Sequence, residues 1–251
     1  MKKVLFFLVC LQLISCYKKK LIEVVEVPLP SKDQKIEIGS PDDVKAKEGT
    51  FSLQKIDFKY NALDPAIDAL TLETLYSRFY LNYTNNLNSI INGTEQENSS
   101  IEDILKKIDL NNPDLRNNAG GYFNETLFFS TISPKSGGVP KDTLAGAINK
   151  EFESFENFKV KFSDVASKQF GSGWAWLVVD KTGKLVITST SNQDNPLMPK
   201  QPVSGTPILG IDVWEHAYFL NHRNQRRKYI DSFYTIIDWK KVGDKYEETL
   251  K

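Results

Sequence analysis

The chain has 251 residues, with 32 basic and 32 acidic side chains, two histidines and two cysteines. Its length permits one large domain or two small ones with an ample hydrophobic core, and zero net charge gives no basic excess for binding nucleic acid. Two cysteines exclude a disulfide framework and a cysteine-rich zinc site, and two histidines exclude any site that needs three.

The first 16 residues have the pattern of a secretory signal peptide. Two lysines precede an apolar run over residues 4–14, which is too short to cross a bilayer as a helix. The segment ends in LISC and resembles the lipobox of bacterial lipoproteins, in which the cysteine, here Cys16, becomes lipid-modified. We expect export to the bacterial cell envelope and a lipid anchor in the membrane. The alternative is a plain signal peptide with a chance cysteine.

Residues 17–50 are rich in lysine, glutamate, aspartate and proline and show no helical periodicity. This composition predicts a flexible tether that spans roughly 30 Å as a coil.

From residue 51 onward, apolar residues recur with helical spacing. Thr71 is a plausible N-cap, and a 3-4-3-4 apolar pattern runs from Leu72 to Ile91, where Asn92-Gly93 ends it. Further helical patterns cover residues 100–108, about 118–130, 143–153 and 155–169.

A β-rich region follows these helices. Residues 174–179 and 185–190 flank Asp180-Lys181-Thr182-Gly183, which predicts a hairpin, and residues 207–213 predict a third strand. Two more helices are predicted near residues 214–221 and 224–237. Helices followed by a small antiparallel sheet with flanking helices predict an α+β fold that begins with a helical hairpin.

Several motifs in this body resemble those of the iron/manganese superoxide dismutases. They are NNLN at 85–88, RNNAGG at 116–121, GSGWAWLVV at 171–179, STSNQDNPLMP at 189–199, DVWEHAY at 212–218 and the closing RNQRRKYIDSFYTIIDW. The resemblance implies an N-terminal α-hairpin domain over residues 51–140. It also implies a C-terminal α/β domain over residues 141–251, with a three-stranded antiparallel sheet, and a metal between the two domains.

Members of this family convert two superoxide ions and two protons into O₂ and H₂O₂ at a manganese or iron ion. Three neutral imidazoles and one carboxylate hold that ion. The resemblance places Asp212 and His216 at the carboxylate and the last imidazole. The other two imidazole positions fall on Leu75 and Glu125, so two of the four family ligands are absent.

Leucine cannot bind a metal ion, and Glu125 offers only oxygen, so at most a degenerate site of Asp212, His216 and Glu125 remains. We expect no metal, or a weakly bound divalent ion that the family suggests is manganese or iron. Without a metal, we expect either a protonated His216 paired with the carboxylates or a proton on one carboxylate. The second histidine, His222, is expected on the surface.

Other positions of the family site are retained. Tyr83 matches the active-site tyrosine and lies on one helix face with Leu75, and Gln193 matches the glutamine that hydrogen-bonds metal-bound solvent. The family's aromatic residues around the site match Trp174, Trp176 and Trp214. Phe129 replaces a further tryptophan. Without a metal, the catalytic role of Tyr83 and Gln193 is in doubt.

The resemblance also implies a homodimer. A histidine and a tyrosine that pair across the family's dimer interface are here Phe79 and Phe219, whereas Glu215, which bridges to the partner subunit, is kept. Replacing both members of a buried polar pair with apolar groups can be nearly neutral, so this double change suggests a repacked pocket.

These observations predict a catalytically inactive lipoprotein of the superoxide dismutase family, reused as a binding or structural module whose protein or ligand partner the sequence does not name. The alternative is an active or residual dismutase that uses the degenerate site.

Overall fold

The helical hairpin at the start of the body forms as its apolar periodicity predicts. The computed structural model describes residues 37–134 and 136–251. The first long helix runs without a break through α2 (Ala69–Thr74), the π-helical η4 (Leu75–Tyr80) and α3 (Leu81–Ile91). Asp68 caps this helix by accepting a hydrogen bond from the Thr71 N–H at 2.7 Å, so the predicted N-cap at Thr71 is wrong. The helix ends at Asn92, as predicted.

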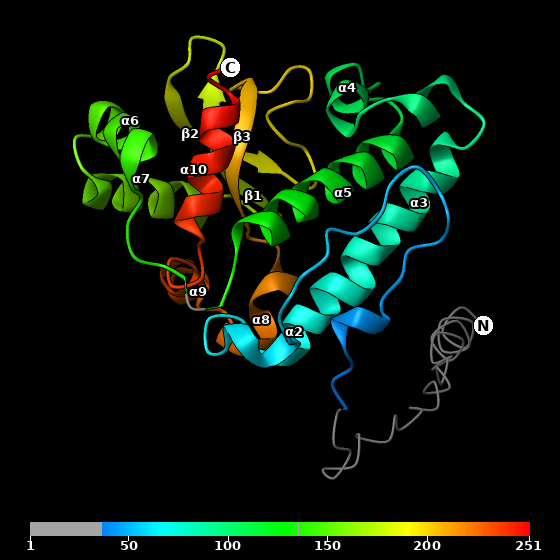
Figure 1. Ribbon diagram of the computed structural model, residues 1–251, viewed down its shortest axis with the longest axis horizontal. Helices are drawn as coiled ribbons and strands as arrows, with labels where there is room; N and C mark the ends of the chain where they lie inside the picture. Colours follow the sequence, from blue (N-terminus) through cyan, green and yellow to red (C-terminus); the bar gives the residue numbers. More distant parts are fainter. Residues whose placement is uncertain (1–36, 135) are drawn as a thin grey trace, which may run out of the picture. The chain divides into compact units, whose positions relative to one another are not determined.

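The second arm of the hairpin is α5 (Pro113–Thr131), which follows the short α4 (Ile101–Lys106). α5 begins five residues before the predicted start at 118, because Asn112 caps it and Pro113 fits the first turn. The Asn112 side chain accepts a hydrogen bond from the Leu115 N–H at 3.1 Å. α5 packs against α3 on one side and against the sheet on the other (Figure 1).

Two glycines allow α5 to approach its neighbours closely. A Cβ atom on Gly120 would lie 2.1 Å from the backbone oxygen of Gln193, and one on Gly121 would lie 2.6 Å from the Tyr83 ring. Both distances are far below van der Waals contact, so any larger residue would push α5 away from the Gln193 backbone and the Tyr83 ring.

The sheet has three antiparallel strands in the order β2-β1-β3, which confirms the predicted α+β fold. The strands are β1 (Gly173–Asp180), β2 (Leu185–Ser191) and β3 (Gly205–Asp212). The Asp180 side chain accepts hydrogen bonds from the N–H groups of Thr182 and Lys184 and so closes the predicted hairpin turn. β1 is the central strand, and its first seven residues are buried.

The remaining helices are short elements beside the hairpin and helices of the C-terminal part. They are η2 (Pro41–Asp43), η3 (Tyr60–Leu63), η5 (Glu95–Asn98), α6 (Asp142–Phe152), α7 (Phe155–Lys168), η6 (Glu215–Ala217), α8 (Phe219–His222), α9 (Arg226–Phe233) and α10 (Trp239–Glu248). The single helix predicted over residues 214–221 is therefore split, and α9 is shorter than predicted. α7 packs against β1 and β2, and α10 packs against α5, α6 and β3.

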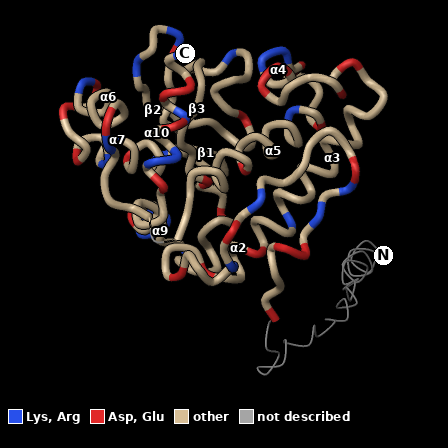
Figure 2. Tube along the Cα trace, in the orientation of Figure 1, with Lys and Arg blue, Asp and Glu red and all other residues tan. Residues whose placement is uncertain are grey.

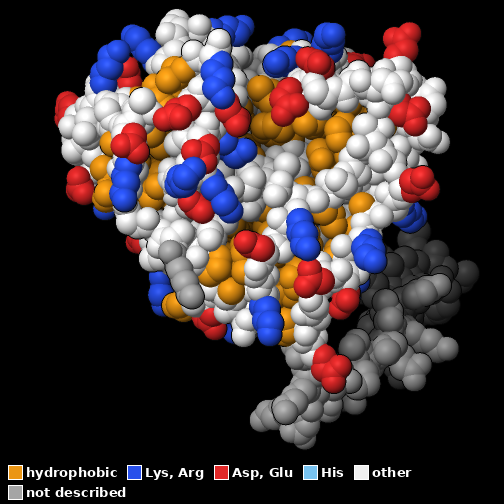
Figure 3. Space-filling view, in the orientation of Figure 1, with side chains coloured by type: hydrophobic (Ala, Val, Ile, Leu, Met, Phe, Trp, Pro, Cys, Tyr) orange, Lys and Arg blue, Asp and Glu red, His pale blue; other side chains and the backbone are white. Residues whose placement is uncertain are grey.

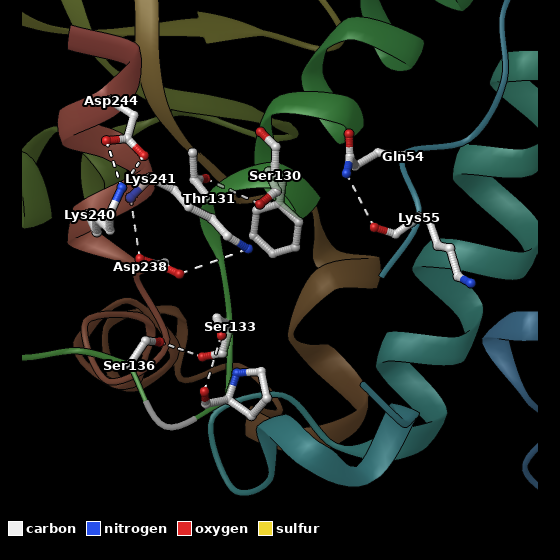
Figure 4. A network of polar contacts seen from close by, with 12 residues as sticks. Gln54, Lys55, Ser130, Thr131, Ser133, Ser136, Asp238, Lys240, Lys241 and Asp244 are labelled. Atoms are coloured by element: carbon white, nitrogen blue, oxygen red, sulfur yellow. Dashed lines mark hydrogen bonds and ion pairs between the residues drawn. The ribbon is translucent and has the colours of Figure 1, made fainter. Parts of the chain in front are cut away.

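α10 has no counterpart among the predicted helices. Asp238 caps it by accepting a hydrogen bond from the Lys241 N–H at 3.3 Å, and Trp239, Val242 and Tyr246 bury one face. Its start is joined to the end of α5, because the Asp238 N–H donates to the Thr131 backbone oxygen at 2.8 Å. Figure 4 shows this junction, in which Asp238 lies beside Lys241.

Residues 38–50 do not form part of a flexible tether, and that boundary of the prediction is wrong. The Gly39 N–H donates to the Glu73 side chain at 2.9 Å, and the Lys47 N–H donates to the Asn85 side chain at 2.7 Å. These bonds, together with burial of Pro41, hold the segment against the hairpin in one compact unit over residues 38–251. The predicted signal peptide, Cys16 and tether residues 17–36 lie outside the described residues.

Charged residues of both signs are interspersed along the described chain (Figure 2). On the face drawn in Figure 3, they are interspersed with apolar side chains and form no patch of one sign. Within the described ranges, no helix has both the length and the apolar character needed to cross a membrane.

The close approach of α5 can be tested by changing Gly120 to alanine. We expect Gly120→Ala to lower the free energy of unfolding by about 1–3 kcal/mol, because the new methyl group overpacks against Gln193. The control is Gly146→Ala in α6, where nothing lies within 4 Å of the added atom, and stability should stay equal or rise by up to about 1 kcal/mol. Urea denaturation measures both, and equal stabilities would contradict the close approach.

Candidate functional site

The long first helix turns three predicted residues toward the interior. Leu75 is completely buried, and the ring of Phe79 stacks on the His216 ring with centroids 4.0 Å apart. The Tyr83 hydroxyl accepts a hydrogen bond from the Gln193 side chain at 3.1 Å. The helix therefore lines the same region from Leu75 to Tyr83.

Three ionisable side chains from three different elements meet in this region. Glu125 lies in α5, Asp212 is the last residue of β3, and His216 lies in η6. One ligand atom from each residue lies within 4.8 Å of the others. Asp212 Oδ2 and His216 Nε2 are 3.1 Å apart, and Asp212 Oδ1 accepts a hydrogen bond from the Trp214 N–H at 2.7 Å. The three residues that the sequence analysis left as possible metal ligands thus form one cluster.

Glu125 is the least satisfied member of this cluster. Its side chain is completely buried, and neither carboxylate oxygen has a hydrogen-bond partner among the described residues. Burial, and then the nearby charge of Asp212, raise the pKa of Glu125 well above its usual range. This direction favours the second of the two predicted protonation states, in which a carboxylate takes up the proton.

Gln193 is at the centre of a buried hydrogen-bond network beside the cluster. Its amide nitrogen donates to Tyr83, and its amide oxygen accepts from Trp174 Nε1 at 3.0 Å and from Asn124 Nδ2 at 2.9 Å. Asn195 donates to the Asn124 side-chain oxygen at 3.0 Å. Neither asparagine was among the predicted site residues, although Asn195 lies inside the motif at 189–199 and Asn124 directly precedes Glu125. The network holds α5, β1 and the loop after β2 in one arrangement.

Aromatic rings surround the imidazole of His216. Besides Phe79, it stacks on Trp214, with ring centroids 5.3 Å apart and an interplanar angle of 17°. Two other predicted aromatic positions are buried. Trp176 Nε1 donates to the Thr190 hydroxyl at 2.8 Å, so the indole N–H has its hydrogen-bond partner inside the sheet. Phe129 is buried among the aromatic rings of Tyr76, Tyr80 and Phe128.

Two of the predicted interface residues, Glu215 and Phe219, are partly exposed. The Glu215 carboxylate accepts a hydrogen bond from the Ser172 hydroxyl at 3.0 Å and lies 3.4 Å from the Arg226 guanidinium. Phe219 is half exposed. Glu215 is therefore held by its own chain while its neighbour at 219 faces solvent.

His222 is buried, and the prediction that it lies on the surface is wrong. Its Nε2 atom lies 2.9 Å from the backbone oxygen of Ala66, and its ring packs against Tyr229. The neighbouring Asn221 side chain donates to the Pro65 backbone oxygen at 3.0 Å. His222 thus fixes the chain before α2 and takes no part in the cluster.

Comparisons with known proteins agree with this geometry. Residues 50–133 match a family model described as "Iron/manganese superoxide dismutases, alpha-hairpin domain", and residues 140–245 match the one described as "Iron/manganese superoxide dismutases, C-terminal domain". The chain is 43% identical over 203 residues to "Superoxide dismutase [Mn]" of Acinetobacter baylyi, a match that covers 80% of this chain and 89% of that protein. It is 42% identical over 205 residues to "Superoxide dismutase [Mn/Fe]" of a Methylomonas species, covering 80% of this chain and 99% of the relative. A third relative, "Superoxide dismutase [Mn]" of Pseudomonas aeruginosa, is 43% identical over 203 residues, a match that covers 79% of this chain and 98% of the relative.

The donor set does not fit the redox metal that these relatives' names imply. The resemblance calls for three imidazoles and one carboxylate, whereas the cluster offers one imidazole, from His216, and two carboxylates. Leu75 fills the remaining position with a buried apolar side chain. Carboxylate oxygens favour harder ions than the imidazole-rich set of the family does.

The raised pKa of Glu125 predicts how stability depends on pH. The measurement is made in the presence of a metal chelator. The contribution of Glu125 to the free energy of unfolding is fully present below its pKa in the unfolded chain, about 4.3. It is lost as the pH rises toward the higher pKa in the folded protein. Relative to Glu125→Gln, the unaltered protein should lose about 1.4 kcal/mol of unfolding free energy per pH unit in this window. The exposed Glu48→Gln is the matched control. Urea denaturation at a series of pH values from about pH 4 upward measures the difference. Parallel pH profiles for all three proteins would contradict a raised pKa.

Proposed function

This chain belongs to the iron/manganese superoxide dismutase family, and we propose that it uses the family fold as a binding or structural module instead of catalysing dismutation. The observation that carries this proposal is the composition of the cluster at the family's metal position. Leu75 and Glu125 stand where the resemblance requires imidazoles. The curated relatives are named as dismutases, but a shared fold does not fix a shared activity.

Loss of two ligands has a large expected effect on a redox metal. Removing a group that merely hydrogen-bonds a ligand costs about 10–100-fold in metal affinity or activity. Leu75 removes a ligand outright, and its burial leaves no polar atom in its place. Glu125 exchanges a neutral nitrogen donor for a charged oxygen, which changes the charge of the site as well as its geometry.

Changes around the cluster support the same conclusion. Phe79 stacks directly on His216, where the family has a polar residue at the substrate gate. The family's polar partner for position 79 is a tyrosine, which Phe219 replaces here. Both members of the family's polar pair are therefore apolar in this chain. Such a paired replacement is close to neutral for stability, whereas a single one leaves a polar group unpaired at about 1–3 kcal/mol. The coordinated change suggests selection for a stable fold without a substrate channel.

One observation favours the alternative, an active or residual dismutase that uses Asp212, His216 and Glu125. The Tyr83, Gln193 and Trp174 hydrogen bonds that surround the family's metal are retained. A buried network of this kind also stabilises a fold that carries no metal, because every member is satisfied. The network alone therefore does not favour catalysis.

We also propose that the protein is a lipoprotein of the cell envelope. The support is the order of a basic start, an apolar run of residues 4–14 and the LISC ending at Cys16. A single lipid chain holds a protein to a membrane only weakly, so more than one acyl group is needed for a stable anchor.

A homodimer is the assembly that we propose for the body. Phe170 is 96% exposed and Phe219 is 50% exposed, which is unusual for phenylalanine in a monomer. The turn that carries Phe170 is rigid, because Arg226 donates to the backbone oxygens of Gln169 and Gly171 on either side of it. A fixed, exposed phenylalanine of this kind suits burial against a second copy.

The catalytic proposal is tested by restoring the two missing imidazoles. We expect the unaltered protein to contain no stoichiometric manganese or iron and to show no dismutation above background. Leu75→His with Glu125→His should bind either metal more than 100-fold more tightly than each single variant, since the ligands act together. Metal analysis and a superoxide dismutation assay measure this. Stoichiometric iron or manganese with high activity in the unaltered protein would overturn the proposal.

The anchor is tested with Cys16→Ser in cells supplied with labelled palmitate. The unaltered protein should carry the label and sediment with membranes, whereas the variant should lose the label completely. Cys10→Ser is the matched control and should keep it. Label on both cysteine variants, or on none of the three proteins, would refute a lipid anchor at residue 16.

The dimer is tested with Phe170→Glu. We expect the unaltered protein to sediment as a dimer at micromolar concentration and the variant to dissociate with at least a tenfold higher dissociation constant, because a buried charge replaces an aromatic contact. The control is Val160→Glu, at a residue in α7 that is 57% exposed. A monomeric unaltered protein, or equal dissociation of both variants, would rule out this interface.

A further inference from the structure

The proposed loss of dismutase activity does not explain why a carboxylate is buried at position 125. The Glu125 side chain is completely buried, and neither oxygen meets a donor in the part of the chain that the structure describes. Buried polar groups are as a rule hydrogen-bonded, because an unpaired one is costly. A structural module with no ligand at this place would be more stable with an apolar residue or an amide there.

The three side chains of the cluster are close enough to one another to share one ion. Neither Glu125 oxygen has a hydrogen-bond partner among the described residues, and a ligand atom of Glu125 lies within 4.8 Å of those of Asp212 and His216. A tetrahedral zinc ion binds oxygen and nitrogen at about 2.0–2.2 Å, which places two of its ligands about 3.4 Å apart. A side-chain movement of roughly 1 Å would therefore close the cluster around an ion.

We propose that Glu125, Asp212 and His216 bind one Zn²⁺ ion, with His216 Nε2 and one oxygen of each carboxylate as ligands. The two carboxylates balance the charge of a divalent ion, so the buried complex would carry no net charge. The inference rests on the proposed function, because an ion with a single stable oxidation state cannot dismutate superoxide. Zinc would hold α5, the end of β3 and η6 together.

The donor chemistry favours zinc over manganese, iron, calcium and magnesium. Imidazole nitrogen and carboxylate oxygen are regular zinc ligands, and three protein ligands with one further position are sufficient. Sites built from nitrogen and oxygen bind zinc more tightly than manganese or iron. Calcium takes about six to eight oxygen ligands and magnesium keeps several waters, which two completely buried carboxylates do not accommodate.

The test is a zinc titration of the full chain after treatment with a chelator, followed by isothermal calorimetry. The unaltered protein should bind one Zn²⁺ per chain, and Glu125→Gln, which keeps the shape of the side chain, should bind more than 100-fold more weakly. The exposed Glu48→Gln should bind as the unaltered protein does. Zinc should raise the melting temperature of the unaltered protein and of Glu48→Gln and leave that of Glu125→Gln unchanged. Circular dichroism checks that all three proteins are folded.

Absence of stoichiometric zinc binding by the folded, unaltered protein would overturn the zinc site, and so would equal binding by Glu125→Gln. A crystal structure grown with zinc that shows only a water between Glu125 and Asp212 would also overturn it. The dismutation assay is independent of these results. Activity with manganese or iron overturns the proposed function, whereas a failed zinc titration without such activity overturns the zinc site alone.

Discussion

The burial of two carboxylates beside a single imidazole is the constraint on which the rest of the site depends. Glu125 and Asp212 are both fully removed from solvent, and ionised carboxylates in such an environment cost several kcal/mol each unless they are paired. His216 Nε2 lies 3.1 Å from Asp212 Oδ2 and is the partner of that carboxylate. The charge of the other carboxylate must be neutralised by a proton or balanced by a cation. A cation in this role need not change its oxidation state.

Packing and hydrogen bonds position the elements that carry this cluster. Gly120 and Gly121 bring α5 against Gln193 and Tyr83, and the amide of Gln193 is satisfied on both sides. Phe79 and Trp214 stack on the His216 ring and limit its orientation. Because these contacts come from hydrogen bonds and packing, two changes of ligand can alter the chemistry of the site while the architecture persists. The same fold can therefore serve members that differ in function.

Local patterns predicted most of the regular structure. The apolar spacing of the first long helix, the β-hairpin around Asp180 and the three-stranded sheet all appear in the structure. The failures fall where capping or tertiary contact decides the outcome. Asn112 and Asp238 start helices that apolar periodicity alone did not place, and residues 38–50 pack on the hairpin although their composition resembles that of a linker.

The sequence by itself determined which ligands are possible: a chain with two histidines cannot supply three imidazoles, and Leu75 cannot bind a metal. Only the tertiary structure decided how those residues are used. His222 is buried because it meets Ala66 across 156 positions of the chain, and Asn124 reaches Gln193 across 69. Likewise, the packing of α5 against β3 and η6 places Glu125 beside Asp212 and His216, without a hydrogen-bond partner for either of its oxygens among the described residues. Contacts between such distant segments leave no periodicity in the sequence, since each depends on how whole elements pack.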